Sequence, residues 1–80
     1  MKYFVEDNNA LKALFEFGDF LEAIDFVNQV ADVAIQLEHH PDILLHDFKN
    51  VTITSSTHDK GNTITDKDKE LAQQIEALME

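Results

Sequence analysis

The sequence contains no cysteine, no tryptophan and a single proline, and only two of its 80 residues are glycine. Without cysteine, neither a disulfide framework nor a thiolate zinc site can form. The scarcity of glycine and proline, with a hydrophobic content of 44%, argues against a disordered or loop-dominated chain. We expect one domain over residues 1–80, and some help from self-association, because so short a chain buries only about 60% of its unfolded surface.

Positive charge and long apolar runs are also scarce. Six basic residues stand against 16 acidic ones, and the resulting formal charge of −10 argues against direct binding to nucleic-acid phosphates. No apolar run approaches the roughly 20 residues that a membrane span needs. The N-terminal sequence MKYFVEDNN has acids where a signal peptide needs an apolar run. We therefore expect a cytoplasmic protein that binds neither nucleic acid nor a membrane.

The first third of the chain has the pattern of a β-hairpin followed by a helix. Residues 2–6 are aromatic and β-branched, Asp7-Asn8-Asn9 are turn formers, and residues 11–17 alternate in polarity. Asp19 with Glu22 three residues later resembles a capping box, which predicts a helix from Phe20 to about Leu37.

The predicted helix has more apolar surface than one neighbour can bury. One apolar stripe runs through positions 20, 24, 27, 31 and 34, and further apolar residues at 23, 26, 30, 33 and 37 widen it. We expect the phenylalanines at 15, 17, 20 and 26 to face the core. Pro41 disfavours helical geometry at His40, so the helix should end near Glu38 and leave His39 and His40 on a loop.

The second half predicts a strand and then a helix. Residues 48–57 are rich in Val, Ile and Thr, with an apolar face at 51 and 53 and an unusually polar opposite face. Thr65 with Asp68 forms another capping box before an amphipathic segment that begins at Leu71. The predicted order is β-β-α-β-α, with room for a short extra strand between Ile43 and Asp47. This order predicts an α+β two-layer sandwich, in which two helices cover one face of an antiparallel sheet. The open edges of such a sheet invite pairing with a second subunit.

Three of the four histidines lie at predicted element boundaries, where they can share one pocket. His39 and His40 follow the first helix, and His58 ends the polar strand. Imidazoles titrate near neutral pH, so in an elimination one of them can donate a proton as the acid while another accepts one as the base. The nearby acids Glu38, Asp42 and Asp59 would favour the protonated form of these imidazoles.

Other interpretations of these residues remain open. Each histidine could be a surface or capping group, and His46 fits no pattern. Two or three histidines with Glu38 or Asp68 could bind zinc, although adjacent side chains such as His39 and His40 tend to point apart in an extended segment. Phe48, beside the polar face, could stack on a flat heterocycle.

The motifs together resemble the pterin-4a-carbinolamine dehydratase family. The matching blocks run in order along the chain: Phe15-Glu16-Phe17, Asp19-Phe20 with Ala23, Glu38-His39-His40-Pro41, Val51-Thr52-Ile53, Thr57-His58, Gly61, Thr65, and Asp68-Lys69-Glu70-Leu71-Ala72. A histidine pair before proline is weak by itself, but the ordered set covers nearly the whole chain. The resemblance implies a two-layer α/β domain that assembles into homodimers or homotetramers.

The resemblance further implies a hydro-lyase that dehydrates a 4a-hydroxytetrahydropterin to a quinonoid dihydropterin without a metal or other cofactor. On this basis the catalytic residues are His39 and His58 as the acid/base pair, with His40 holding the pterin. The implied substrate-binding residues are Glu38, Pro41, Phe48, Thr57 and Asp68. Asp68 would orient His58 or bind the donor edge of the ring.

Three departures from the family pattern leave other functions open. The N-terminus is shorter than in many relatives, and Tyr3 stands about where a Trp is usual. Ile35 stands where the family commonly carries an acid, four residues before the first histidine, and Glu38 or Asp32 could compensate. The segment between His58 and Asp68 is one residue longer than usual. The alternatives are a non-catalytic module that binds a pterin or a protein partner, like the dimerisation cofactors of this family, and a pterin-binding protein of another pathway.

Overall fold

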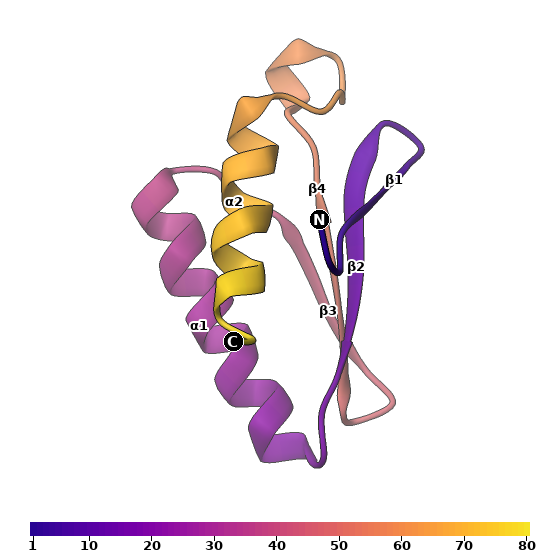
Figure 1. Ribbon diagram of the computed structural model, residues 1–80, viewed down its shortest axis with the longest axis vertical. Coiled ribbons are helices and arrows are strands. Elements are labelled where there is room, and N and C mark those ends of the chain that lie inside the picture. Colours follow the sequence, from indigo (N-terminus) through magenta and orange to yellow (C-terminus); the bar gives the residue numbers. More distant parts are fainter.

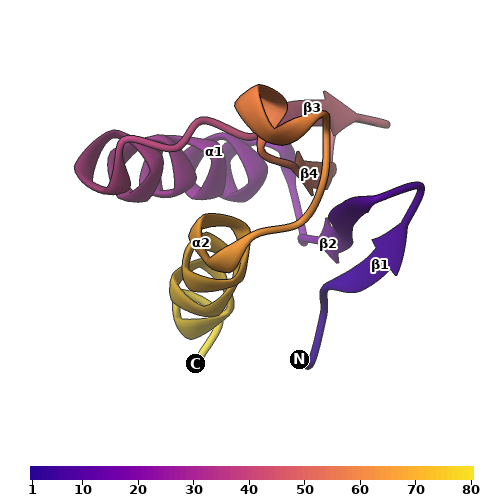
Figure 2. The same cartoon turned by 90° about the horizontal axis from the view of Figure 1, so that it is seen from above.

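The computed structural model describes the backbone of residues 1–80 and the side chains of all residues except Lys60. The chain forms an antiparallel four-stranded sheet with the strand order β1-β2-β4-β3, and both helices lie on the same face of it (Figures 1 and 2). The elements are β1 (Val5–Asp7), β2 (Ala10–Glu16), α1 (Phe20–Leu37), β3 (Asp42–His46), β4 (Asn50–Ser55), the short 3-10 helix η1 (His58–Lys60) and α2 (Asp66–Ala77). The predicted α+β sandwich is confirmed.

The sheet has one strand more than the main prediction, at the place where the sequence left room for it. β3 pairs with β4 from Asp42 opposite Thr54 to His46 opposite Asn50. The turn between them consists of Asp47, Phe48 and Lys49, and the first two have φ angles of 52° and 54°. Residues in this left-handed region cannot continue a strand, so β4 begins at Asn50 and not at Phe48.

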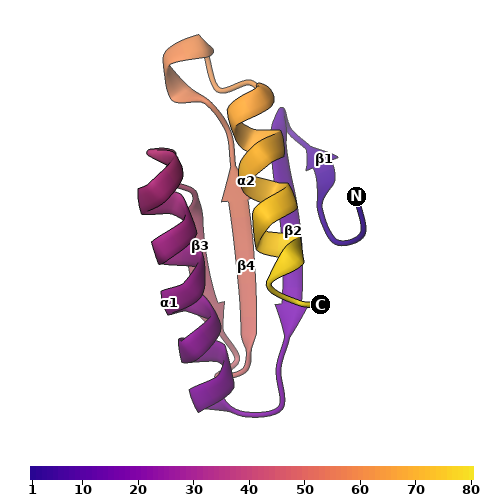
Figure 3. The same ribbon diagram turned by 60° about the vertical axis from the view of Figure 1, so that its left-hand side comes forward.

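The inner face of the sheet follows the predicted alternation. Leu11, Ala13 and Phe15 of β2 are buried, and so are Val51 and Ile53 of β4. Their neighbours along each strand point to the outer face, which no helix covers (Figure 3).

Both ends of α1 are set by local interactions. Asp19 accepts a hydrogen bond from the Glu22 backbone N–H at 2.8 Å, whereas the Glu22 side chain accepts from the Gly18 N–H at 3.0 Å, one residue before the expected partner. At the other end, Glu38 adopts a left-handed conformation with φ 53° and closes the helix. His39 and His40 therefore leave the helix on a loop, as predicted.

The buried face of α1 differs from the predicted stripe. Its buried residues are Ala23, Phe26, Val30 and Ala34. Phe20 is 54% exposed, so its expected place in the core is wrong. The side chains with 3-4-4 spacing from Ala23 face the sheet. Phe20 lies about 75° around the helix from the centre of this buried face, so its side chain turns toward solvent.

α2 runs opposite to α1 and carries its own cap. Thr65 and Asp68 form the predicted capping box, and Leu71, Ala72 and Ile75 are buried. Near its end, the Glu76 carboxylate accepts hydrogen bonds from the backbone N–H groups of residues 2, 3 and 4, at 3.1, 2.6 and 2.9 Å. This contact holds the N-terminal segment against the end of α2, as the positions of the two termini in Figure 2 show. In the part of the chain that the structure describes, neither helix has the length and apolarity to cross a membrane.

Candidate active site

Three element ends meet on one side of the molecule: the end of α1, the end of β4 and the start of α2 (Figure 1). Between them lies a cavity of about 350 Å³. Its lining residues are Glu38, His39, His40, Ser56, Thr57, His58, Asp59 and Lys67. The fold therefore brings His39, His40 and His58 to one cavity, as the sequence predicted.

Asp68 is the centre of the hydrogen bonds behind this cavity. Its Oδ1 accepts from Ser55 Oγ at 2.6 Å and lies 2.6 Å from His39 Nε2. Its Oδ2 accepts from Thr57 Oγ1 at 2.8 Å and from the Thr65 backbone N–H at 2.9 Å. The carboxylate is fully buried, and these bonds come from three segments of the chain: the loop after α1, the end of β4, and the start of α2. Its position is therefore fixed.

The charge of Asp68 follows from these contacts. Burial alone would raise the pKa of Asp68, but hydrogen bonds from Ser55, the Thr65 backbone, His39 and Thr57 outweigh it and lower the pKa to about 2. At neutral pH the group is a carboxylate and can only accept hydrogen bonds. Therefore His39 Nε2 carries the hydrogen, and in the neutral imidazole Nδ1 holds the lone pair.

The local sequence explains how His39 reaches this carboxylate. The left-handed turn at Glu38 redirects the chain, and the His39 backbone N–H then donates to the Ala34 carbonyl at 3.1 Å. The His39 side chain, 12% exposed, lies between the cavity and Asp68. Asp68 serves both as the third residue of the capping box and as the partner of His39, because a capping side chain already points toward the start of its helix.

His58 is held differently from His39. Its Nδ1 lies 2.6 Å from the Asn62 amide oxygen, and the residue is exposed. Because a carbonyl oxygen only accepts, His58 Nδ1 donates and Nε2 is free to exchange a proton. Asp68 contacts His39 and not His58, and it is buried behind the cavity. The structure therefore corrects both sequence-based roles of Asp68, orienting His58 and binding the ring directly.

The remaining predicted site residues divide into two groups. Glu38 and Thr57 line the cavity, although the Thr57 hydroxyl is engaged with Asp68 and with Thr65 Oγ1 at 2.7 Å. Pro41 connects the histidine loop to β3 and is not among the lining residues. Phe48 lies at the β3–β4 turn, whereas the cavity lies beyond the opposite end of the hairpin.

The separation of Phe48 from the cavity corrects its predicted position. β3 begins at Asp42 and ends at His46, four residues later, so the strand is about 13 Å long. The three-residue turn between β3 and β4 holds Phe48 at the far end, where it is 62% exposed. Within one chain, Phe48 therefore does not reach a ligand in the histidine cavity. His46 lies at the same far end, where its Nε2 is 2.9 Å from Thr52 Oγ1.

Sequence reasoning placed Asp59 near the histidines but missed three residues at the site: Ser55, Ser56 and Lys67. Ser55 had one available signal, because it is a polar residue on the apolar side of a strand and so needs a buried partner. Lys67 had none, since a lysine in the first turn of a polar helix segment is ordinary. Among the side chains that the structure describes, no three His, Asp or Glu residues are grouped to hold a metal ion.

Comparisons with known proteins identify the family of this chain. A family model described as pterin 4 alpha carbinolamine dehydratase matches residues 2–78. A protein of Sulfolobus acidocaldarius, provisionally named pterin-4-alpha-carbinolamine dehydratase, is 38% identical over 72 residues, which cover 90% of this chain and 77% of that protein. A Cyanothece protein with the same provisional name is 49% identical over 63 residues, covering 79% of this chain and 63% of the relative.

Two solved structures have the same fold. A transcriptional coactivator/pterin dehydratase from Brucella melitensis superimposes with a TM-score of 0.80 and 33% identity, over 91% of this chain and 76% of the other. A pterin dehydratase-like protein described as a RuBisCO assembly factor of the α-carboxysome has a TM-score of 0.72 over 94% of this chain and 84% of the other. Its identity of 21% shows a common fold and no more.

Proposed function

The chain belongs to the pterin 4 alpha carbinolamine dehydratase family, and from this premise we propose that it dehydrates a 4a-hydroxytetrahydropterin to a quinonoid dihydropterin in the histidine cavity. The observation that carries the proposal is the His39–Asp68 pair beside His40 and His58. The cavity volume of about 350 Å³ lies within the usual range of about 300–1,000 Å³ for small-ligand sites. We further propose a cytoplasmic location, in keeping with the absence of cysteine.

The reaction needs two proton transfers and no redox step. The bond between C4a and its hydroxyl oxygen breaks as that oxygen takes up a proton and leaves as water. The proton on N5 is removed, and its bonding electrons form the double bond between C4a and N5. One group must therefore donate a proton on one side of the ring while another accepts one.

We assign the base to His39. The Asp68 carboxylate holds Nε2–H in place, which leaves Nδ1 to accept the proton from N5. The imidazolium that forms is stabilised by the buried negative charge beside it, in the manner of a carboxylate-oriented histidine base. Asp68 is a positioning residue in this scheme, since it touches His39 and not the substrate.

We assign the acid to His58, because in its imidazolium form Nδ1–H donates to Asn62 and Nε2–H is free to protonate the leaving hydroxyl oxygen. We assign pterin binding to His40. Glu38 lines the cavity directly before His39, and in this scheme it takes the place of the acid that the family carries where this chain has Ile35. Asp32 is not among the lining residues, so Glu38 is the better candidate for this compensation.

The test is the decay of freshly prepared 4a-hydroxytetrahydropterin, followed by ultraviolet absorbance. Wild-type protein should accelerate the decay, and His39→Ala and His58→Ala should each lose most of the acceleration while remaining folded. His46→Ala is the matched control, because His46 lies at the far end of the hairpin. No acceleration by folded wild-type protein would overturn the proposal.

A second candidate function is protein binding. Phe20, Leu21 and Ile35 of α1 are 54%, 67% and 64% exposed, although they are large and apolar. Such side chains gathered along one helix mark an interaction surface. In this second proposal the surface binds another copy, giving the homodimer or homotetramer that the family resemblance implies, and β3 offers an unpaired edge for the same purpose. Sedimentation analysis of wild type and Leu21→Glu separates the possibilities: a monomer in both would exclude self-association through α1.

A further inference from the structure

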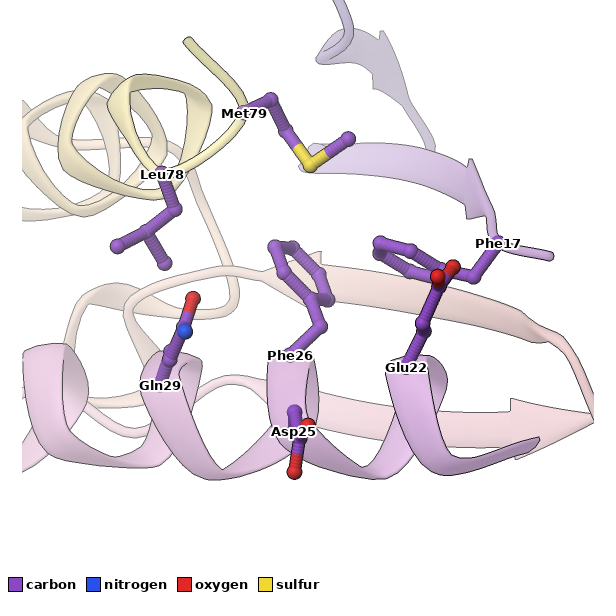
Figure 4. Close-up of a pocket in the computed structure, with 7 residues that line it drawn as sticks. All are labelled: Phe17, Glu22, Asp25, Phe26, Gln29, Leu78 and Met79. Carbon is purple, nitrogen blue, oxygen red and sulfur yellow. The ribbon is translucent and has the colours of Figure 1, made fainter. Parts of the chain in front are cut away.

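The buried polar side chains of this protein gather at one place. Among the side chains that the structure describes, three polar residues are buried, and hydrogen bonds join them: Ser55, Thr57 and Asp68. A second cavity, of about 230 Å³, lies between the first half of α1 and the residues after α2, and Figure 4 shows the Phe26 ring in the middle of it. The polar side chains that line this second cavity are all exposed: Glu22, Asp25 and Gln29. A buried hydroxyl costs free energy unless it is hydrogen-bonded, so the contact with Asp68 is what allows Ser55, 1% exposed, on the inner face of β4.

Ser55 and His39 bind the same oxygen atom. Ser55 Oγ donates to Asp68 Oδ1 at 2.6 Å, and His39 Nε2 lies 2.6 Å from the same atom. The other oxygen, Oδ2, accepts from Thr57 Oγ1 and from the Thr65 backbone N–H. An ionised carboxylate has about four lone-pair sites, and these donors are enough to fill them. The Ser55 hydroxyl therefore occupies the site on Oδ1 next to the one that His39 uses.

A second donor on Oδ1 weakens the attraction between Asp68 and the His39 imidazolium. Burial raises the pKa of Asp68, and among the hydrogen bonds that lower it to about 2, the one from Ser55 has the largest effect. The hydroxyl that stabilises the carboxylate charge also takes up part of it, so less of this charge acts on a proton bound to His39. Without the hydroxyl, the carboxylate would hold the imidazolium more strongly.

We propose that Ser55 is a positioning residue that limits the base strength of His39 through Asp68 Oδ1. The inference rests on the proposed dehydration, in which His39 Nδ1 accepts the proton from N5. A base must be neutral before it accepts a proton, so too strong a pull from Asp68 would leave His39 protonated and inactive at neutral pH. The Ser55 proton stays on Oγ throughout the reaction, and Asp68 stays ionised. Ser55 thus acts on the base only through Asp68.

Other titratable side chains line the cavity beside His39 and do not depend on Ser55. They come from the cap of α1, the loop after it, η1 and α2: Glu38, His40, His58, Asp59 and Lys67. Their charges act on His39 as well, and they stay in place when only Ser55 is changed. A difference in the His39 titration between wild type and a Ser55 variant therefore reports the contact with Asp68.

The test compares wild type with Ser55→Ala in a pH titration of the His39 ring protons, followed by proton NMR and assigned from the spectrum of His39→Ala. In Ser55→Ala, His39 should bind its proton about 3–10-fold more tightly, because one hydrogen bond to a charged group is lost. The acid limb of the rate profile should move to higher pH by the same factor. Ser55→Ala should therefore be slower than wild type in mildly acidic solution and about as fast in alkaline solution. A purely structural role would lower the rate at every pH without moving the titration.

Three further variants complete the comparison. Ser55→Thr keeps the hydroxyl and should titrate like wild type. Ser55→Cys keeps the size of the side chain with a weak S–H donor and should resemble Ser55→Ala, which covers the case in which Ser55→Ala does not fold. Thr54→Ala removes a hydroxyl from the outer face of the same strand and should leave the titration and the rate unchanged.

The two measurements separate the role of Ser55 from the proposed function. An active wild-type protein with an unchanged His39 titration in folded Ser55→Ala or Ser55→Cys would overturn the role of Ser55 alone. A wild-type protein without dehydratase activity, in which the titration still moves, would contradict the dehydration and support the coupling of Ser55 to His39 through Asp68.

Discussion

His39 Nε2 lies 2.6 Å from Asp68 Oδ1, which joins the loop after α1 to the first turn of α2. The same carboxylate also binds Ser55 at the end of β4. One side chain therefore links both helices and the central strand of the sheet. The orientation of the proposed base depends on the same hydrogen bonds that hold these elements together.

Asp68→Asn should reduce the dehydration rate by about 10²-fold, because it removes the charge that stabilises the His39 imidazolium and changes the hydrogen-bond role of one oxygen. The fold-decrease in the rate constant at saturating substrate should be larger than the fold-change in the Michaelis constant. The pH profile of the rate should also shift, which a purely structural role would not cause. Glu70→Gln, an exposed change on the same helix, is the control, and equal rates for the two variants would refute the positioning role.

Asp68 should also contribute to the pH dependence of stability. Its pKa is about 2 in the folded protein and 3.8 in the reference state, so the unfolded chain binds the proton more tightly. Its contribution is complete above about pH 5 and is lost as the pH falls through about 4 to 2. The size is roughly 2 kcal/mol, since one pKa unit corresponds to about 1.4 kcal/mol. Urea unfolding across this pH range should show a smaller loss of stability on acidification in Asp68→Asn than in wild type.

Ile35→Glu should raise the dehydration rate by up to about tenfold, because a carboxylate one helical turn before His39 restores the charge that the family pattern carries there. The side chain is 64% exposed, so the change should alter the free energy of unfolding by only about 0.5 kcal/mol. Phe20→Glu changes another exposed apolar residue, at the start of the helix, and should leave the rate unchanged. A lower rate in Ile35→Glu would show that apolar contact at this position matters more than charge.

Phe48→Gly should stabilise the protein by about 1 kcal/mol, because Phe48 has a φ angle of 54° and left-handed geometry costs a residue with a side chain about 1–2 kcal/mol. The Michaelis constant should not change if each site is made by one chain, because Phe48 lies at the far end of the hairpin. Thermal unfolding and steady-state kinetics measure the two effects. An increased Michaelis constant would instead indicate that Phe48 reaches the site of a second copy.

The sequence predicted the features of the site that depend on nearby residues better than the features that depend on the packing of distant segments. The end of α1 near Glu38, the loop position of His39 and the capping box of Asp68 all depend on residues within a few positions of each other. Phe48 was misplaced because its β-forming side chain gave no sign of the left-handed turn that Asp47 begins. Phe20 was misplaced because two apolar stripes competed for one sheet face.

The sequence by itself determined the class of the fold, the helix ends and the three histidines at element boundaries, because periodicity, capping and proline geometry are local. Only the tertiary structure decided that Asp68 pairs with His39 and not with His58. That choice depends on how far α2 lies from the loop after α1, and this distance is set by the packing of both helices on β2, β3 and β4. Contacts between residues 29 positions apart are fixed by the whole core, and no short segment of the chain encodes them.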